Sequence, residues 1–429
     1  MRKVVLLMLV ISMLLIASAA MAQVTTITYG YWMSEQQPGI EAQIAAFEKA
    51  YPNIKVKAEL VPWADYWVKL QSMLAAGTCW DVLTMDNGEY LKDFASKGIL
   101  LDIAPLVKRD NIDLSLYPEA LVKMGEYNGH LYSLPRDYDT EAIIYNKDMF
   151  DKAGIEYPNW NWTWTDVVLA AQKLTIKNSK GNTIQYGITS EGGGLNNEQC
   201  MIYPLMFSNG VPINKEGVVE YDTPQAQAVM NSLYTLTKDG YAPSPSLPTS
   251  SSDLFYADKA AMSFEGSWMV NYYAANIGKS FKWGIAPFPV MGIRANISDS
   301  LGDDIWAGSP HKEAAWTFVK FLESQQGEDI LAKTGVVIPA IKGAAQLWVD
   351  YYTNLYGPEF GKEAQIYVDQ VKYTTGYPCS YGEVQWNSNV TTYGYELKML
   401  AGQISIADGC AQEYKQVMQV VAENTPQSQ

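Results

Sequence analysis

Histidine is almost missing from this chain of 429 residues, which contains only His130 and His311. Histidine is the side chain that titrates near neutral pH, and it is also the commonest ligand for transition metals. Its scarcity therefore disfavours a hydrolase built on a catalytic histidine and a transition-metal site. We expect both histidines to be surface residues, and we expect no cofactor and no bound metal.

Cysteine is also scarce, with four residues whose spacing matches no zinc-binding motif. In an oxidising compartment four cysteines allow one or two disulfides. The pairing that we expect is Cys379 with Cys410, both late in the chain; the other two cysteines are Cys79 and Cys200.

Positive charge is in deficit, because 31 lysines and arginines stand against 46 aspartates and glutamates, for a net charge of −15. Such a surface repels nucleic acids and anionic membranes, so neither is expected as a partner. It also disfavours a polyanionic ligand, although a local basic pocket would override that effect.

A long apolar run occurs only at the beginning of the chain. Arg2 and Lys3 precede VVLLMLVISMLLIA, and AMA before Gln23 fits the small-x-small rule for signal cleavage. A membrane anchor is the alternative, but the run is short for a membrane span. We therefore predict a signal peptide over residues 1–22, cleaved near Ala22, and a mature chain of net charge −17 that is exported to the periplasm or the extracellular space.

The first part of the mature chain alternates patterns typical of strands and of helices. Three strands are predicted, over 26–32, 54–60 and 81–85, and the second of them alternates apolar and polar residues as a half-buried strand does. Helices are predicted between the strands, the first capped by Ser34 and the second over about 65–76. This alternation predicts an α/β fold with helices on the faces of a sheet. The length exceeds what one core supports, so two domains are expected.

Further helices are predicted later in the chain. They lie near 166–176, over 224–238 with Thr223 as the cap, and after Ser309–Pro310. A Pro/Ser-rich stretch over 241–253 is expected to be a surface loop.

Three long stretches resemble one family. LPRDYDTEAIIYNKDMFDKAGI, LFYADKAAMSFEGSWMV and SPHKEAAWTFVKFLESQQGEDILAKTGVVIPA are similar to the extracellular solute-binding proteins of bacterial ABC sugar importers, the maltose-binding-protein-like group. The resemblance implies two α/β lobes that face each other across a ligand cleft, with several hinge crossings. The crossings are expected near 134–139, 287–290 and 334–340. The N-terminal lobe would then comprise 24–134 plus 289–333, and the C-terminal lobe 135–288 plus 334–429.

The same resemblance implies a function. The chain would bind a carbohydrate, an oligosaccharide in our interpretation, outside the cytoplasmic membrane and deliver it to the permease of an ABC transporter by closing its lobes. It would act as a monomer and would not be an enzyme.

A sugar site needs flat aromatic rings for the C–H faces and polar groups for the hydroxyls. The composition suits such a site, with 13 Trp and 29 Tyr against 11 Phe. In the family the tryptophan of a Gly-x-Trp turn stacks on a sugar ring, and Trp268, two residues after Gly266, matches it. The alternative is a partly buried packing tryptophan.

Strand ends supply further candidates, because open α/β sheets bind ligands there. Tyr31 and Trp32 end the first strand, and Asp86 and Asn87 follow the third. Trp63 lies at the approach to the next helix. Asn87 has the alternative role of a helix cap.

The hinge and the C-terminal region supply the remaining candidates. Asp139 matches an acid that contacts the ligand in the family, and Arg136 either binds an acidic sugar or pairs with an aspartate. The other candidates are Asp303, Asp304 and Trp306, where the family has glycines that line the cleft, and Tyr381 and Trp386 in a stretch that often supplies an aromatic ring. In contrast, Trp67, Trp162 and Trp164 are expected in the core.

Two other function classes remain open. A secreted carbohydrate-active enzyme also combines aromatic rings with paired acids, such as Asp303 with Asp304 or Asp137 with Asp139. The same fold could instead bind a non-sugar solute such as a polyamine, which the anionic composition allows.

Overall fold

The computed structural model describes residues 24–245, 251–382, 385 and 391–426. The predicted signal peptide and Trp386 lie outside the described residues. Within these ranges, none of the helices combines the length and the apolar character that a membrane crossing requires.

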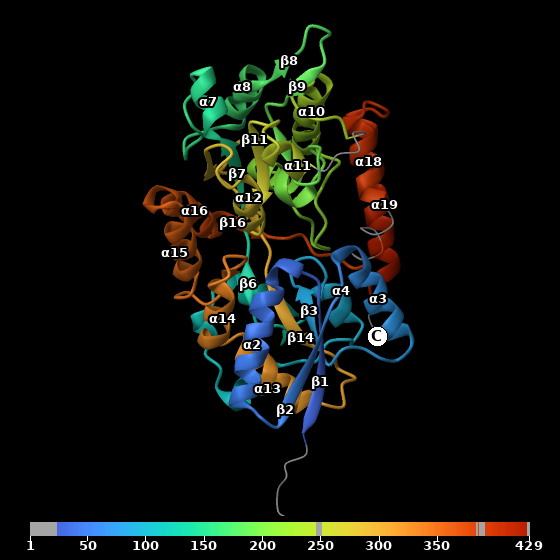
Figure 1. Ribbon diagram of the computed structural model, residues 1–429. Helices are drawn as coiled ribbons and strands as arrows, with labels where there is room; N and C mark the ends of the chain where they lie inside the picture. Colours follow the sequence, from blue (N-terminus) through green and yellow to red (C-terminus); the bar gives the residue numbers. More distant parts are fainter. Residues whose placement is uncertain (1–23, 246–250, 383–384, 386–390, 427–429) are drawn as a thin grey trace, which may run out of the picture.

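The chain folds into two α/β lobes, each built around a four-stranded sheet (Figure 1). In the first lobe, drawn at the bottom of Figure 1, β1 is parallel to β2 and β3, whereas β14 is antiparallel to β3. All three predicted strands are confirmed. In spatial order the strands are β14 (Leu301–Ile305), β3 (Val82–Asp86), β1 (Thr25–Tyr31) and β2 (Ile54–Leu60).

Helices cover the first sheet because their apolar faces need burial. In α13 the predicted apolar residues Ala315, Phe318 and Leu322 are buried. The helices are α2 (Gln37–Ala50), α3 (Trp63–Ala75), α4 (Leu91–Ser96), α5 (Ala104–Asp110), α6 (Glu119–Met124), α13 (Lys312–Leu322) and α14 (Gln325–Ala332), with the short turns η1 (Ser34–Gln36) and η2 (Leu114–Leu116) and the hairpin β4 (Glu126–Tyr127) and β5 (His130–Leu131).

The second lobe contains the other sheet, in which β7 is central and antiparallel to both β11 and β12, and β10 is parallel to β11. Its strands, in spatial order, are β10 (Thr189–Ser190), β11 (Met262–Gly266), β7 (Glu141–Asn146) and β12 (Trp283–Pro287). Its other elements up to β13 are α7 (Lys147–Ala153), α8 (Trp164–Leu174), β8 (Ile176–Lys177), β9 (Thr183–Gln185), η3 (Glu198–Ile202), α9 (Tyr203–Ser208), α10 (Pro224–Lys238), α11 (Ser251–Tyr256), α12 (Met269–Ile277) and β13 (Asn296–Ser298).

The C-terminal region packs mostly on the second lobe. α16 contacts β12, and α18 and α19 contact α10, so that α19 runs along one side of the molecule (Figure 1). The elements are α15 (Ala345–Tyr356), α16 (Pro358–Gln370), η4 (Val371–Tyr373), β16 (Thr374–Gly376), α18 (Thr391–Leu400) and α19 (Ile406–Asn424).

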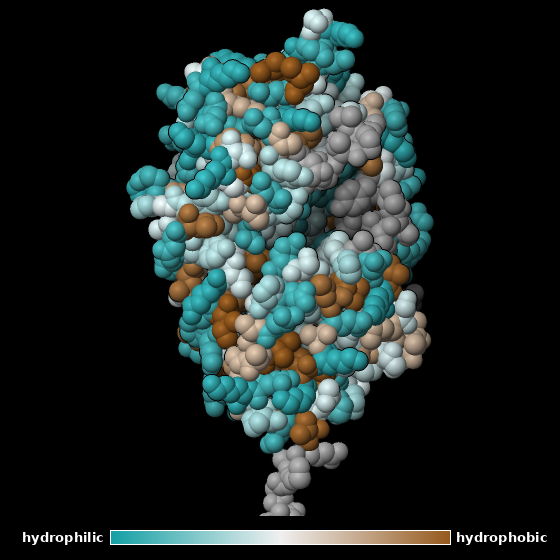
Figure 2. Space-filling model, viewed as in Figure 1, coloured by the Kyte–Doolittle hydropathy of each residue, from teal (hydrophilic) through white to brown (hydrophobic). Residues whose placement is uncertain are grey.

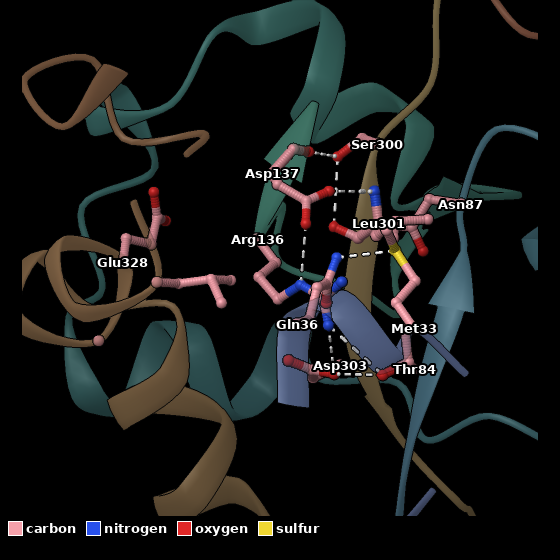
Figure 3. Close-up of polar contacts among 12 residues, drawn as sticks. Met33, Gln36, Thr84, Asn87, Arg136, Asp137, Ser300, Leu301, Asp303 and Glu328 are labelled. Carbon is pink, nitrogen blue, oxygen red and sulfur yellow. Dashed lines mark hydrogen bonds and ion pairs between the residues drawn. The ribbon is translucent and has the colours of Figure 1, made fainter. Parts of the chain in front are cut away.

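Two predicted crossings lie side by side. β6 (Asp137–Tyr138) pairs antiparallel with β15 (Ile338–Pro339). The backbone N–H of Arg136 donates to the carbonyl of Leu301 at 2.8 Å, and that of Asp139 donates to the carbonyl of Asp299 at 3.2 Å. Three chain segments therefore meet where the lobes join, and Figure 3 shows the polar contacts of Arg136 and Asp137 with the segment that contains Ser300 and Asp303.

The exact lobe boundaries stay a prediction. The contacts indicate that the chain crosses back into the first lobe after residue 289, which was the predicted boundary. The N–H of Val290 donates to the carbonyl of Trp162, and Ile297 in β13 is packed in the core of the second sheet. The chain re-enters the first sheet only with β14. Sequence similarity alone does not reveal the lobe to which residues 290–298 belong, because this segment contains no long helix or strand.

Helix starts follow the local chemistry at some sites and not at others. Thr223 caps α10 as predicted, accepting a hydrogen bond from the N–H of Ala226 at 3.2 Å. The prediction that Ser34 caps the first long helix is wrong: Ser34 begins η1, and its hydroxyl donates to Glu35 Oε2 at 3.0 Å.

Trp162 and Trp164 are buried in the hydrophobic core of the second lobe, as expected.

None of the four cysteines, all of which belong to the described part of the chain, forms a disulfide. The thiol of Cys410 is buried 3.8 Å from the sulfur of Met399, and the thiol of Cys379 donates to the carbonyl of Glu89 at 3.2 Å. The expected disulfide between Cys379 and Cys410 is therefore wrong, because each thiol packs in separate surroundings.

Candidate functional site

A cavity of about 550 Å³ lies between the lobes, a size typical of small-molecule sites. In Figure 2 the largely hydrophilic surface is hollowed between the two halves of the molecule. The cavity is lined from the first lobe by the ends of β1 and β3 and by α3, from the second lobe by the loop after β10 and by the start of α12, and at its base by the crossings. The lining residues are Trp32, Met33, Gln36, Trp63, Trp67, Val68, Asp86, Glu89, Tyr90, Asp137, Tyr138, Asp139, Glu191, Asn197, Glu198, Gln199, Ser267, Trp268, Asp299, Leu301, Val336, Val337 and Tyr377.

The first-lobe wall is a cluster of aromatic rings. Trp32 packs edge-on against Trp63, with ring centroids 5.1 Å apart, and Trp63 packs edge-on against Trp67 at 5.4 Å. Tyr90 lies 4.1 Å from Trp67. Because the rings support one another, Trp63 stays 42% exposed beside the cavity without losing its orientation.

The facing wall carries Trp268, which is held by a glycine and a carboxylate. A Cβ on Gly266 would lie 2.0 Å from the indole of Trp268, so the ring crosses the backbone where only glycine fits. The indole N–H of Trp268 donates to Glu191 Oε1 at 3.3 Å. The turn after β11 therefore presents the indole to the cavity.

Gly266→Ala is expected to displace this indole and to weaken ligand binding about tenfold. Isothermal titration calorimetry with the ligand of the wild type would measure the effect. Gly394→Ala is the matched control, because a Cβ at Gly394 meets no atom within 4 Å. Equal affinities of the two variants would contradict this account of the turn.

The base of the cavity holds a chain of three aspartates. The carboxylate of Asp299 accepts the N–H of Gly88 at 2.7 Å, and Asp139 Oδ1 accepts the N–H of Asp299 at 2.9 Å. Asp86 and Asp299 interact through their carboxyl groups. Burial, and then the charge of Asp299, raise the pKa of both Asp86 and Asp139 well above the usual range.

Burial also raises the pKa of two further carboxyl groups that line the cavity, those of Asp137 and Glu198. Burial raises the pKa of Asp137 to about 6, although Arg136, whose Nε lies 3.1 Å from Asp137 Oδ2, acts in the opposite direction. Burial raises the pKa of Glu198 to about 7. The cavity is therefore acidic, and part of its carboxyl groups hold protons near neutral pH.

Five of the thirteen predicted site residues line the cavity: Trp32, Trp63, Asp86, Asp139 and Trp268. They come from both lobes and from the first crossing. Trp67, which was expected in the core, both packs in the core and lines the cavity.

Tyr31 and Asn87 are next to lining residues but face elsewhere. Tyr31 is buried in the core and stacks on Tyr29 at 5.6 Å, because alternate residues of β1 point to the same face. The side-chain amide of Asn87 donates to the hydroxyl of Ser133 at 2.9 Å.

Arg136 and Asp303 meet beneath the cavity and do not line it (Figure 3). Arg136 Nη1 lies 3.3 Å from Asp303 Oδ1, which also accepts the hydroxyl of Tyr29 at 2.8 Å. Arg136 pairs with aspartates, which was the alternative to binding an acidic sugar. Asp304, the next residue, is also buried away from the cavity.

Trp306 lies at the wrong end of β14 to reach the cavity. β14 is antiparallel to β3, so Leu301 pairs with Asp86 at the cleft end, whereas the N–H of Trp306 donates to the carbonyl of Asp81 at the opposite end. Tyr381 also lies outside, where its hydroxyl is 3.1 Å from that of Tyr127 and Lys92 Nζ lies 4.4 Å from its ring centroid.

The most important residues that sequence reasoning missed are Glu191, Glu198 and Asp299. Glu191 and Glu198 flank a loop, EGGGLNNE, that combines glycines and amides directly after a strand. That pattern is the signal that could have identified them, because ligands bind at such strand ends. Asp299 gave no signal, since its role depends on the pairing of the crossings.

One group of acids among the described residues has the spacing of a metal site. Glu198, Glu396 and Glu413 are buried and bring ligand atoms within 4.8 Å of one another. The hydroxyl of Tyr221 donates to Glu396 Oε1 at 3.0 Å. Burial raises the pKa of all three carboxyl groups, which favours their protonated forms in this cluster.

Known proteins share both the sequence and the fold. The galactooligosaccharide-binding protein of Bacillus subtilis (strain 168) is 28% identical over 326 residues, which are 72% of either chain. A putative binding protein of Brucella abortus (strain 2308) is 28% identical over 351 residues, 80% of this chain and 82% of the relative. Among solved structures, an ABC substrate-binding protein from Listeria monocytogenes in complex with cycloalternan is 25% identical, with a TM-score of 0.79, and the match covers 93% of this chain and 99% of that chain.

The sequence model for bacterial extracellular solute-binding proteins matches residues 33–329. This match contains the whole second sheet, the strands β2, β3 and β14 of the first sheet, and most of the segments that line the cavity. The two-lobed fold and the cleft that the sequence predicted are thereby confirmed, and the chain belongs to the family of bacterial extracellular solute-binding proteins.

Proposed function

We propose that this chain binds an oligosaccharide in the cavity between its lobes and delivers it to the membrane permease of an ABC transporter. The observation that carries the proposal is the presence of tryptophans on facing walls, Trp32, Trp63 and Trp67 from one lobe and Trp268 from the other. Its family acts outside the cell membrane, and we propose export through cleavage near Ala22 and Gln23.

The tryptophan planes would pack on the C–H faces of sugar rings, while amides and carboxyl groups would bind the hydroxyls. Asn197, Gln199 and Ser267 supply neutral polar groups on the second-lobe wall. A partly protonated carboxyl group both donates and accepts, as a hydroxyl does, so few buried polar groups would stay unpaired. The names of relatives from Bacillus subtilis, which bind galactooligosaccharides and arabinooligosaccharides, support this ligand class.

The lobes would close over the ligand, because only the closed form brings both tryptophan walls onto it. The adjacent crossings formed by β6, β15 and the start of β14 provide the hinge in this proposal. The closed complex would then dock on the permease, and the chain itself would act as a monomer.

Binding without chemical conversion is the function that we favour over hydrolysis. The relatives are binding proteins. Of the acid pairs considered for an enzyme, Asp303 and Asp304 are buried away from the cavity, and Asp137 is paired with Arg136. Release of reducing ends from oligosaccharides by the purified protein would overturn this choice.

A thermal-shift screen against mono- and oligosaccharides, uronates included, would test the proposed function. At a hundredfold excess over Kd a ligand stabilises the folded chain by about 2.7 kcal/mol, which gives a clear rise in Tm. We expect neutral or basic oligosaccharides to raise Tm and uronates to have no effect, because the cavity is acidic.

Small-angle X-ray scattering would then test closure with a ligand from that screen. We expect a smaller radius of gyration in the complex. An unchanged radius would contradict the closure step, and failure of every saccharide to raise Tm would contradict the ligand class.

A further inference from the structure

Every charged side chain that lines the cavity is acidic. Among the lining residues, all of which belong to the described part of the chain, there is no lysine, arginine or histidine. The acids come from both lobes and from the crossings, and they are Asp86, Glu89, Asp137, Asp139, Glu191, Glu198 and Asp299. These groups offer hydrogen bonds to a neutral sugar, and a lining with seven carboxyl groups and no basic side chain also offers partners for a positive charge on the ligand.

The buried arginine near the cavity does not balance this charge. Arg136 is turned away from the lining, with Nε 3.1 Å from Asp137 Oδ2 and Nη1 3.3 Å from Asp303 Oδ1. Its charge is therefore opposed by one lining acid and by one acid outside the cavity. Among the salt bridges of the described residues, no basic side chain pairs with five of the other lining acids, which are Asp86, Asp139, Glu191, Glu198 and Asp299.

The acids interact with one another. Asp86 and Asp299 are in contact, Asp139 accepts the N–H of Asp299, and Gln199 Nε2 lies 3.4 Å from the second oxygen of Asp139. Each of these carboxyl groups has a pKa raised by burial and, for Asp86 and Asp139, by the charge of Asp299. Protonation offsets these charges in the ligand-free cavity, and a bound cation would take over that role and favour the ionised carboxylates.

The aromatic walls favour the same kind of guest. A cation within about 6 Å of an indole face is attracted by the ring, and the gain is larger when water is excluded. Trp63 and Trp268 stand on opposite walls, with the aspartates at the base between the lobes. Aromatic faces together with carboxylates form the combination that recognises an ammonium group.

We propose that the saccharide bound by this chain carries positively charged amino groups, as in an oligosaccharide of unacetylated amino sugars. The inference rests on the proposed function and adds the substrate class. The geometry points to Asp86, Asp139 and Asp299 as the partners of one ammonium group at the base, and to Glu191, which accepts the indole N–H of Trp268, as a second acidic contact on the second-lobe wall.

Calorimetry with three matched trisaccharides would test the proposal. β-1,4-linked glucosamine trimers, their N-acetylated form and cellotriose share one backbone and differ only at C2. A second series built on galactosamine, its N-acetylated form and galactose covers another stereochemistry. We expect the amino form of the better series to bind at least about tenfold more tightly than its two neutral analogues. Added salt should weaken only the amino form.

Two variants localise the effect. Asp139→Asn and Glu191→Gln should each lower the ratio of amino to neutral affinity by about threefold or more. Because both ligands are measured on the same protein, a partial folding defect cancels in this ratio. Glu423→Gln changes an exposed acid on α19 and is the control, with an unchanged ratio.

The outcomes separate this inference from the proposed function. Equal or weaker binding of the amino form, with neutral oligosaccharides bound, overturns the inference and leaves the proposed function intact. Binding of spermidine without binding of any saccharide overturns both, since the ligand would then be a polyamine. Tighter binding of the amino form that does not respond to either acidic variant overturns the assignment of the acids.

Discussion

Trp268→Ala is expected to lower the affinity for the oligosaccharide by at least about tenfold, because the stacking plane of the second-lobe wall is lost. The indole is positioned by its close approach to Gly266 and by its hydrogen bond to Glu191. Calorimetry with the ligand found by the thermal-shift screen would measure the loss. The closed form also loses a contact, so the contraction in solution scattering should become smaller.

Trp306→Ala is the matched control for this experiment. Trp306 was predicted from the sequence as a site residue, but the antiparallel direction of β14 puts it far from the cavity. The variant removes the same side chain, and we expect it to change stability without changing affinity. If Trp268→Ala binds as tightly as Trp306→Ala, Trp268 does not contact the ligand.

The ligand-free protein is expected to become less stable as the pH rises from about 4.5 to about 7. Burial raises the pKa of Glu198 to about 7 and that of Asp137 to about 6 in the folded chain, above the values near 4 of unfolded chains. A raised pKa means that the folded state binds more protons, so stability is highest below the unfolded pKa and is lost as these groups ionise. Each such proton contributes a slope of about 1.4 kcal/mol per pH unit.

Differential scanning calorimetry between pH 5 and pH 7.5 would measure this dependence as a fall in Tm of several degrees. Glu198→Gln removes one titrating group and should flatten the curve, whereas Glu423→Gln, on the surface of α19, should not. A Tm that is constant or rises over this range would contradict the prediction, because it would mean that the folded chain does not bind more protons than the unfolded chain. A bound ammonium ligand should also reduce the dependence, because it favours the ionised form.

Local patterns were reliable where a local interaction decides the structure. The Thr223–Pro224 start of α10 and the strand over 54–60 depend on neighbours in sequence, and the structure has both where they were predicted. At Trp268 the Gly-x-Trp spacing brings the indole over the backbone of Gly266, and the contact of this indole with a ligand stays a prediction.

Predictions failed where the position of a side chain depends on a distant strand. Asp303 and Trp306 follow one another closely in sequence, yet one is buried under the cavity in contact with Arg136 and the other lies at the far end of the strand. The partner, direction and register of β14 decide both outcomes, and none of these is encoded in the local pattern. The cysteine pairing failed for the same reason.

The sequence by itself determined the α/β class, the family and the aromatic and acidic character of the chain, because these depend on composition, local periodicity and motifs. The tertiary structure alone decided which of the many acids face the cavity, since Asp299, Glu191 and Glu198 come together only when the crossings pair and the lobes oppose each other. Long-range strand pairing brings acidic residues that are far apart in the sequence into one cavity between the tryptophans of the two lobes.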